Sequence, residues 1–345
     1  MDIRLENVLK YEQPTKYIVK SENYSDDFAL PVLTAGKSFV LGYTDETEGV
    51  CKASENPVII FDDFTADCKY VDFDFKVKSS AMKILHKVNA EDNLKYYFYA
   101  MQAIDYTPFS HKRVWISEYS KFKIENHSIA EQNNIVKDLD AVATAINNAK
   151  QRLNVLDDLV KSRFIEMFGD PEINPNNWEK VVLSEIITTI NNGMTRRGND
   201  EDGNIVLRLV ELQEGHIDYS GVNRIKLKET EKTKYLLKDN DFLFARVNGN
   251  PDYVGRCAVF IEKDEPIYHN DHIIRVHCKD DSFKGVFGSY LFNSDYGKSQ
   301  IRQYISTSAG QFTINQNGIR SVIVILPPIE LQNEFADFVK LIDKS

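Results

Sequence analysis

The chain has 345 residues, enough for two or three domains at roughly 150 residues each. Its 42% hydrophobic and 27% charged residues, with only 16 glycines and 10 prolines, exclude wholesale disorder and a collagenous or low-complexity chain. The net charge of −10 argues against a protein that binds nucleic acid through its overall charge alone, so any surface that binds nucleic acid must be a local basic patch.

Residues 1–127 are predicted to form a first globular unit, in which strand-like runs such as 57–61 alternate with polar turns and a short helix over 91–104. This is an α+β composition. No run approaches 18 apolar residues and Met1–Arg4 does not open a signal peptide, so we expect a soluble cytoplasmic protein without a membrane partner. The four cysteines are widely spaced and predict reduced, buried thiols: Cys51, Cys68, Cys257 and Cys278.

Residues 128–170 are predicted to form one long helix. Apolar residues recur in alternating steps of four and three, which is the pattern of a coiled-coil seam: Ile135, Leu139, Val142, Ile146, Ala149, Leu153, Leu156 and Val160. Ser128 is a candidate N-cap with Glu131 in the capping-box position, and Gly169 is a candidate stop. A helix of about 38 residues spans roughly 57 Å, which favours a spacer arm over a core helix of one large domain.

A second unit is predicted over 171–328, with strands near 242–245 and 273–276 and a helix over 285–303. A final amphipathic helix is predicted over 329–345, and it can cover less than half of the first helix's seam. We therefore expect seam residues left uncovered by this helix to mediate self-association or binding to another subunit: Ile146, Leu153, Leu156 and Val160.

An internal repeat links the two halves at an offset of 200 residues. The segment 129–135, IAEQNNI, is echoed by 329–335, IELQNEF, and a strand-like run precedes each copy. A looser echo relates Leu5–Val8 to Leu183–Ile186. The sequence therefore predicts, in chain order, a globular unit, a long helix, a second globular unit and a short helix.

No catalytic or metal site emerges from the motifs. Gly36-Lys37-Ser38 lacks the earlier glycine of a P-loop, and Asn250–Tyr253 lacks the second proline of the motif with which amino-methyltransferases grip a base. Asp72 and Asp74 alternate with phenylalanine, a pattern that indicates a half-buried strand rather than a metal-binding pair of carboxylates. The spacing of three histidines matches no familiar ligand set: His269, His272 and His277. We expect no catalytic residue, no metal and no cofactor.

Recognition loops remain, in which hydrogen-bond donors stand beside small residues, as contacts to bases and phosphates require. Each loop taken alone is better explained as a solvated turn, and their recurrence in both units supports the set but not its individual members. The candidate DNA-binding residues of the first unit are Thr34, Lys37, Ser38, Lys76, Lys78, Lys112 and Arg113. Those of the second unit are Thr195, Arg196, Arg197, Arg246, Asn248, Asn250, Thr307 and Gln311.

The block 156–171, LDDLVKSRFIEMFGDP, followed by Trp178, resembles the central conserved region of specificity subunits of type I restriction–modification systems. Pro327, Pro328 and Gln332 are similar to the family's PP-x-x-x-Q entry into a conserved helix. In that family the second conserved helix is about as long as the first, so the resemblance implies a shortened C-terminal helix here.

The resemblance implies two target recognition domains, 1–127 and 171–328, each reading one half of a bipartite double-stranded DNA sequence. The helices 128–170 and 329–345 would form an antiparallel coiled coil that separates them. It also implies a non-catalytic subunit that recruits two methylation subunits and the restriction (motor-nuclease) subunits. S-adenosylmethionine is expected only in the methylation subunits. Two alternatives stay open: a stand-alone DNA adenine methyltransferase and a coiled-coil scaffold that does not bind DNA.

Overall fold

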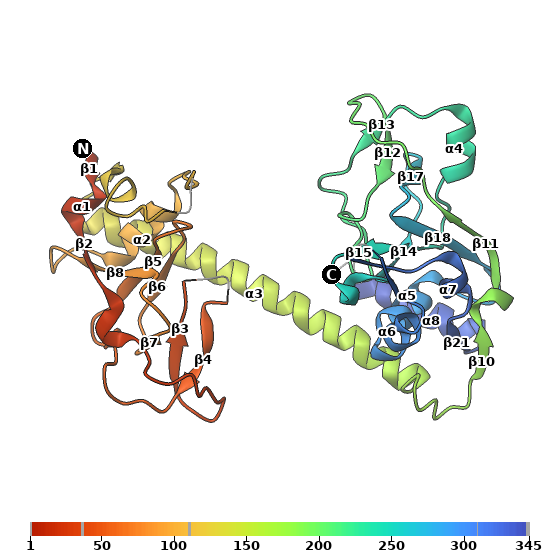
Figure 1. Cartoon of the computed structure of the whole chain (residues 1–345), viewed down its shortest axis with the longest axis horizontal. Coiled ribbons are helices and arrows are strands. Elements are labelled where there is room, and N and C mark those ends of the chain that lie inside the picture. Colours follow the sequence, from red (N-terminus) through yellow and green to blue (C-terminus); the bar gives the residue numbers. More distant parts are fainter. Residues whose placement is uncertain (1, 36–37, 110–111, 309, 343–345) are drawn as a thin grey trace. The chain divides into compact units, whose positions relative to one another are not determined.

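The computed structural model describes residues 2–35, 38–109, 112–308 and 310–342 and has an α+β architecture (Figure 1). Its contacts divide the chain into two compact units, residues 1–150 and 151–345. Helix α3 (Ile129–Phe168) contributes residues to both. Among the described residues, no helix is both long and apolar enough to cross a bilayer. The division into 1–127, 128–170, 171–328 and 329–345 as functional domains stays a prediction.

Helix α3 confirms the long helix expected from the sequence, and its ends follow the predicted capping chemistry. The Ser128 backbone N–H donates to the Glu131 carboxylate at 2.9 Å, and the Glu131 N–H donates to the Ser128 hydroxyl at 3.4 Å. At the other end Gly169 has a φ of +75°, where a side chain would be strained, and its N–H donates to the Ile165 carbonyl at 2.8 Å.

The first unit contains a four-stranded sheet in the order β2-β8-β5-β6, a three-stranded sheet in the order β4-β3-β7 and the pair β1–β9. Apolar residues of the four-stranded sheet pack with α2 and the start of α3. The elements are β1 (Asp2–Arg4), α1 (Leu5–Val8), β2 (Leu9–Glu12), η1 (Pro14–Tyr17), β3 (Leu30–Leu33), β4 (Val40–Thr44), β5 (Val58–Asp62), β6 (Cys68–Val71), β7 (Lys76–Val77), β8 (Met82–Lys87), α2 (Leu94–Gln102), η2 (Tyr119–Lys121) and β9 (Lys123–Glu125).

The second unit contains a four-stranded sheet in the order β11-β18-β14-β16, the sheets β13-β12-β17 and β15-β20-β19, and the pair β10–β21. Its elements are β10 (Glu179–Val182), η3 (Leu183–Glu185), β11 (Ile187–Asn192), β12 (Asn204–Leu207), β13 (Arg224–Ile225), α4 (Glu229–Tyr235), β14 (Asp241–Ala245), β15 (Val247–Asn248), η4 (Pro251–Tyr253), β16 (Cys257–Phe260), β17 (Ile267–His269), β18 (Ile273–Cys278), α5 (Gly285–Asn293), α6 (Asp295–Arg302), β19 (Ser306–Ser308), β20 (Gln311–Thr313), α7 (Gln316–Arg320), β21 (Ile323–Leu326) and α8 (Ile329–Ile342).

The two units share one topology. Each has a four-stranded sheet of matching strand order and a three-stranded sheet with one parallel pair, β3 with β7 and β12 with β17. The Leu5 N–H donates to the Phe122 carbonyl at 3.0 Å, and Leu183 donates to Val322 in the same way at 2.8 Å. The carbonyl residues of these bonds are 200 positions apart, so the structure confirms the predicted repeat.

A buried glutamine occupies the same place in both units. Gln132 accepts a hydrogen bond from the backbone N–H that precedes α2 and donates to the His127 carbonyl, at 3.0 and 3.1 Å. Gln332 accepts from the N–H that precedes α5, at 2.9 Å, and donates to the Pro327 carbonyl, at 2.8 Å. Each glutamine therefore joins the start of its conserved helix to the helix that covers the sheet. The repeated Gln seen in the sequence has this structural cause.

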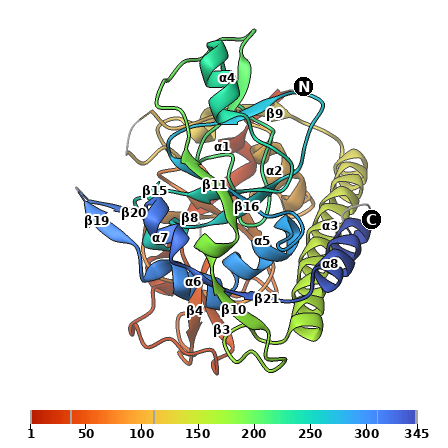
Figure 2. The same cartoon turned by 90° about the vertical axis from the view of Figure 1, so that its right-hand side faces the viewer.

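Helix α8 packs beside the last turns of α3 in the second unit (Figure 2). The Phe335 ring lies 5.5 Å from the rings of both Phe164 and Phe168. Val160 is 3% exposed in the same cluster, so the expectation that it is left uncovered is wrong. Exposed apolar residues do follow the middle of α3, and they form what we call the α3 stripe: Leu139, Val142, Ile146 and Leu153.

The helix expected over 285–303 is two helices, α5 and α6. Ser294 adopts an extended conformation between them, and its hydroxyl accepts the Gly297 N–H at 3.2 Å. A Cβ on Gly297 would collide with the backbone of Leu291 and Phe292. The chain therefore breaks here so that α6 can fold back against α5, a tertiary contact that helical periodicity does not reveal.

Candidate nucleic-acid interface

The loop after β11 is fixed by a close backbone approach in the second unit. A Cβ on Gly193 would collide with the carbonyl oxygens of His269 and Asn270, so glycine is required there. The Met194 N–H then donates to the His269 carbonyl, and Asp271 donates back to the Met194 carbonyl, both at 3.0 Å. These bonds place the 194–198 loop against the 270–272 turn.

Two guanidinium groups gather on that turn. Arg197 Nη2 lies 2.7 Å from Asp271 Oδ1, and Arg246 Nη1 donates to the Asp271 carbonyl at 2.9 Å. The Arg197 side chain remains 54% exposed. Its Nη1 also donates to the Thr195 carbonyl at 2.9 Å and to the Met194 carbonyl at 3.4 Å, and Nη2 lies 3.4 Å from His272 Nε2. These contacts fix the guanidinium at the turn, while the side chain stays partly exposed, where it can meet a base edge or a phosphate.

The hairpin of β19 and β20 lies beside the same cluster. The Ile314 N–H donates to the Arg246 carbonyl at 3.0 Å, and β15 pairs with β20 so that Asn248 lies opposite Phe312. The exposed candidates Thr195, Asn250, Thr307 and Gln311 belong to these three loops. The structure therefore brings the three recognition loops predicted for this unit together.

Three further candidates in this unit also have internal partners. Arg196 donates to both Glu231 oxygens, from Nε at 3.2 Å and from Nη2 at 2.6 Å. The Arg196 side chain is paired with α4, and this geometry does not favour direct contact of Arg196 with DNA. The Asn248 and Asn250 side-chain oxygens accept backbone N–H groups of their own turn at 2.9 and 3.0 Å, so these oxygens are already engaged.

The first unit assembles its candidates less completely. Lys76 is 1% exposed, and its ammonium donates to Glu46 at 2.6 Å and to the Glu48 carbonyl at 2.7 Å, so the prediction that it contacts DNA is wrong. Lys78 pairs with Glu22. The remaining described candidates lie in loops: Thr34, whose hydroxyl donates to the Ser38 carbonyl, Ser38 itself, and the exposed Lys112 and Arg113. Lys37 lies outside the described residues.

Asp74 and His277, singled out in the sequence as possible metal ligands, have partners within the protein. Asp74 accepts from the Ser54 hydroxyl at 2.6 Å and pairs with Lys52 at 2.8 Å. His277 binds Asp241 at 2.8 Å. Within the described ranges, no three His, Cys, Asp or Glu side chains are grouped to hold a metal. The four cysteines are buried free thiols, as predicted.

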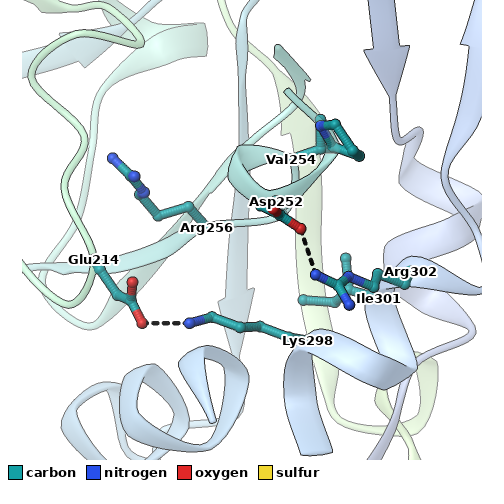
Figure 3. A pocket seen from close by; sticks show the side chains of 9 residues that line it. Glu214, Asp252, Val254, Arg256, Lys298, Ile301 and Arg302 are labelled. Carbon is teal, nitrogen blue, oxygen red and sulfur yellow. Dashed lines mark hydrogen bonds and ion pairs between the residues drawn. The ribbon is translucent and has the colours of Figure 1, made fainter. Parts of the chain in front are cut away.

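A small polar hollow lies between η4 and α6 (Figure 3). It is lined by two ion pairs, Lys298 with Glu214 at 2.6 Å and Arg302 with Asp252. Its volume of about 20 Å³ holds no more than a water molecule. This hollow is therefore too small for a cofactor or a substrate.

His269 is fully buried beneath α4, and burial together with the nearby Arg275 charge lowers its pKa from 6.5 to about 3. An unfolded histidine binds a proton below about 6.5, so acidification favours the unfolded state until the folded pKa is reached. Between pH 7 and 5.5 we expect this residue to cost about 1 kcal/mol of unfolding free energy. Urea unfolding of wild type and His269→Gln at both pH values measures it, and equal losses in the two proteins would contradict the expectation.

The chain is similar to known specificity proteins. Residues 175–345 match the family model of the type I restriction modification DNA specificity domain. The Escherichia coli type I restriction enzyme EcoR124I/EcoR124II specificity subunit is 47% identical over 163 residues, covering 44% of this chain and 40% of that protein. The StySPI specificity subunit of Salmonella potsdam is 29% identical over 220 residues, covering 60% of this chain and 47% of that one. The chain thus spans less than half the length of these relatives.

The fold has a solved counterpart. The crystal structure of the type I restriction-modification system S subunit from M. genitalium superposes with a TM-score of 0.60 at 14% identity, covering 100% of this chain and 89% of the other. Residues 175–345 therefore belong to the family of type I restriction modification DNA specificity domains. The first unit repeats the sheet topology of this matched domain.

Proposed function

We propose that this chain is the DNA sequence-specificity subunit of a type I restriction–modification complex, with each unit reading one half of a bipartite double-stranded target. The observation that carries the proposal is the cluster of Arg197 and Arg246 on the Asp271 turn, where three donor-rich loops meet. Arginine donors match guanine edges and phosphates, whereas asparagine and glutamine match adenine. The repeated topology supports two reading surfaces built on one scaffold.

The proposed partners are two methylation subunits and the motor-nuclease restriction subunits. S-adenosylmethionine would be bound by the methylation subunits, and this chain would supply recognition without catalysis. The α3 stripe supports a protein-binding role for this helix, because its apolar side chains are 38% to 62% exposed. We assign that surface to the methylation subunits, and self-association of the chain is the alternative.

Methylome sequencing of cells that express this chain with its methylation subunits tests the proposal. We expect methylated adenines within one bipartite motif that disappears when the chain is omitted. Methylation that persists with the partner subunits alone would contradict a specificity role. S-adenosylmethionine binding by the purified chain would instead favour the stand-alone methyltransferase, and methylation without any DNA contact by this chain would favour the scaffold.

Arg197→Ala is expected to weaken binding of the target duplex by about 5- to 150-fold, since a good arginine–base pair is worth about 1–3 kcal/mol. Binding is measured by fluorescence anisotropy at fixed salt. Arg152→Ala is the matched control, because Arg152 is an exposed arginine on α3. Equal affinities of the Arg197 and Arg152 variants would remove Arg197 from the interface.

A further inference from the structure

Helix α4 distinguishes the second unit from the first. It stands between β13 and β14, where the equivalent connection of the first unit, from β4 to β5, contains no helix. None of its seven residues is buried, and it lies over β17 (Figure 1). An exposed helix of this length is not stable by itself, so side chains from the rest of the unit must hold it.

Three polar side chains from the sheets hold the C-terminal end of α4. Asn191 Nδ2 of β11 donates to the Lys234 carbonyl at 3.2 Å, and His269 Nδ1 of β17 donates to the Tyr235 carbonyl at 3.2 Å. Arg275 Nη1 of β18 donates to the next carbonyl, that of Leu236. Three successive carbonyls at a helix end, which lack partners within the helix, are thus satisfied by three different strands.

The N-terminal end is held by Glu231. Its carboxylate accepts both Arg196 bonds and also the Lys228 backbone N–H at 2.8 Å. The Arg196 guanidinium lowers the pKa of Glu231, which keeps this carboxylate charged. The same Arg196 donates to the Lys226 carbonyl at 2.6 Å. Because Arg197 follows directly and binds Asp271, the position of α4 is tied to the candidate interface.

The segment 226–234 carries four lysines and two glutamates in a chain of net charge −10. Both glutamates are already paired, Glu229 with Lys232 at 2.8 Å and Glu231 with Arg196. In the part of the chain that the structure describes, the ammonium groups of three exposed residues lie in no ion pair: Lys226, Lys228 and Lys234. Lys234 Nζ lies 5.2 Å from the centre of the Tyr235 ring, and the Lys228 charge helps to lower the pKa of Glu231. Compact cations next to donor-rich loops suit phosphate better than a base edge.

We propose that Lys226, Lys228 and Lys234 bind the phosphate backbone of the duplex beside the bases read by the Arg197 cluster, with α4 clamped for that contact. The inference rests on the proposed DNA recognition and deepens it. It gives α4 a sequence-independent role in affinity, whereas the loops supply specificity. Arg196 and Glu231 then act as positioning residues.

The test is a triple substitution, Lys226→Ala, Lys228→Ala and Lys234→Ala, in the full chain. Anisotropy titrations over a range of salt concentrations, on target and scrambled duplexes, give both affinity and salt dependence. We expect affinity to fall for both duplexes by the same factor and the log–log salt slope to become shallower by about 2–3, since each phosphate contact contributes about 0.9. The matched control removes three exposed lysines elsewhere: Lys161, Lys279 and Lys340.

The outcomes separate the inference from the proposed function. Target binding by wild type with an unchanged slope in the triple variant overturns the role of α4 and leaves DNA recognition intact. A loss confined to the target duplex also overturns it, because the lysines would then read bases. If wild type binds no duplex at all, both proposals fail, and an acidic protein becomes the partner to test for α4.

Glu231→Gln tests the clamp separately from charge. Removing a negative charge beside the lysines would by Coulomb attraction alone tighten DNA binding. Loss of the ion pair with Arg196 frees α4, so we expect weaker binding of both duplexes, with the unfolding midpoint of the second unit nearly unchanged. Tighter binding in this variant would contradict a positioning role for Glu231.

Discussion

Replacing Phe335 with alanine is expected to lower the unfolding free energy of the second unit by about 3–5 kcal/mol, the usual cost of removing a buried phenylalanine ring. Phe335 is fully buried, and its ring lies 5.5 Å from Phe164 and 5.3 Å from Tyr290. The cavity left behind would separate α8 from α3. Urea unfolding followed by tryptophan fluorescence measures the change.

The two tryptophans make this measurement specific to one unit. Trp178 lies in the second unit and donates from Nε1 to the Phe168 carbonyl at 2.8 Å, whereas Trp115 is buried in the first. In a Trp115→Phe background the remaining tryptophan, Trp178, reports the unfolding of the second unit alone. Leu341→Ala is the control, because Leu341 lies on the same helix at 68% exposure and should cost less than about 1 kcal/mol. Equal losses for both variants would show that α8 is not docked by Phe335.

Asp63→Ala is expected to destabilise the first unit by about 3–5 kcal/mol, since it leaves a buried charge without its partner. Asp63 pairs with Lys83 at 3.2 Å, and both side chains are only 2% exposed. The Asp63 carboxylate also accepts the Trp115 N–H at 2.9 Å. Trp115 fluorescence in a Trp178→Phe background follows the unfolding of this unit.

Adding Lys83→Met to Asp63→Ala provides the control for the charge argument. If the cost comes from the unpaired ammonium, the double variant should recover much of the stability lost by Asp63→Ala. Additive losses from the two substitutions would mean that the pair is not coupled.

Asp63 and Arg246 occupy the same backbone position in the two units. The Asp63 N–H donates to the Ala81 carbonyl, and the Asp63 carbonyl accepts from the Val114 N–H. The Arg246 N–H donates to the His272 carbonyl, and the Arg246 carbonyl accepts from the Ile314 N–H. Val114 and Ile314 are 200 positions apart. One side chain is a buried acid and the other a guanidinium at the candidate interface. The backbone scaffold is therefore repeated, whereas the chemistry of the side chain at this position is not.

The long helix, the repeat and the α+β composition could be predicted from the sequence because each depends on neighbouring residues. Capping by Ser128 and Glu131 joins positions three apart, and Gly169 ends the helix through its own backbone conformation. The recurring glutamine, Gln132 and Gln332, was visible as a repeat, although its partners were not.

The exposure and partners of charged side chains were decided only by the tertiary structure. Lys76 and Arg196 both stood in donor-rich segments, yet one is buried against Glu46 and the other is paired with Glu231. These partners are 30 and 35 residues away along the chain. Val160 likewise continues a regular seam but is buried in the same cluster as residues of α8. Periodicity and capping are local properties, whereas burial of a charge depends on which distant segment folds against it, and that information is not contained in spacing.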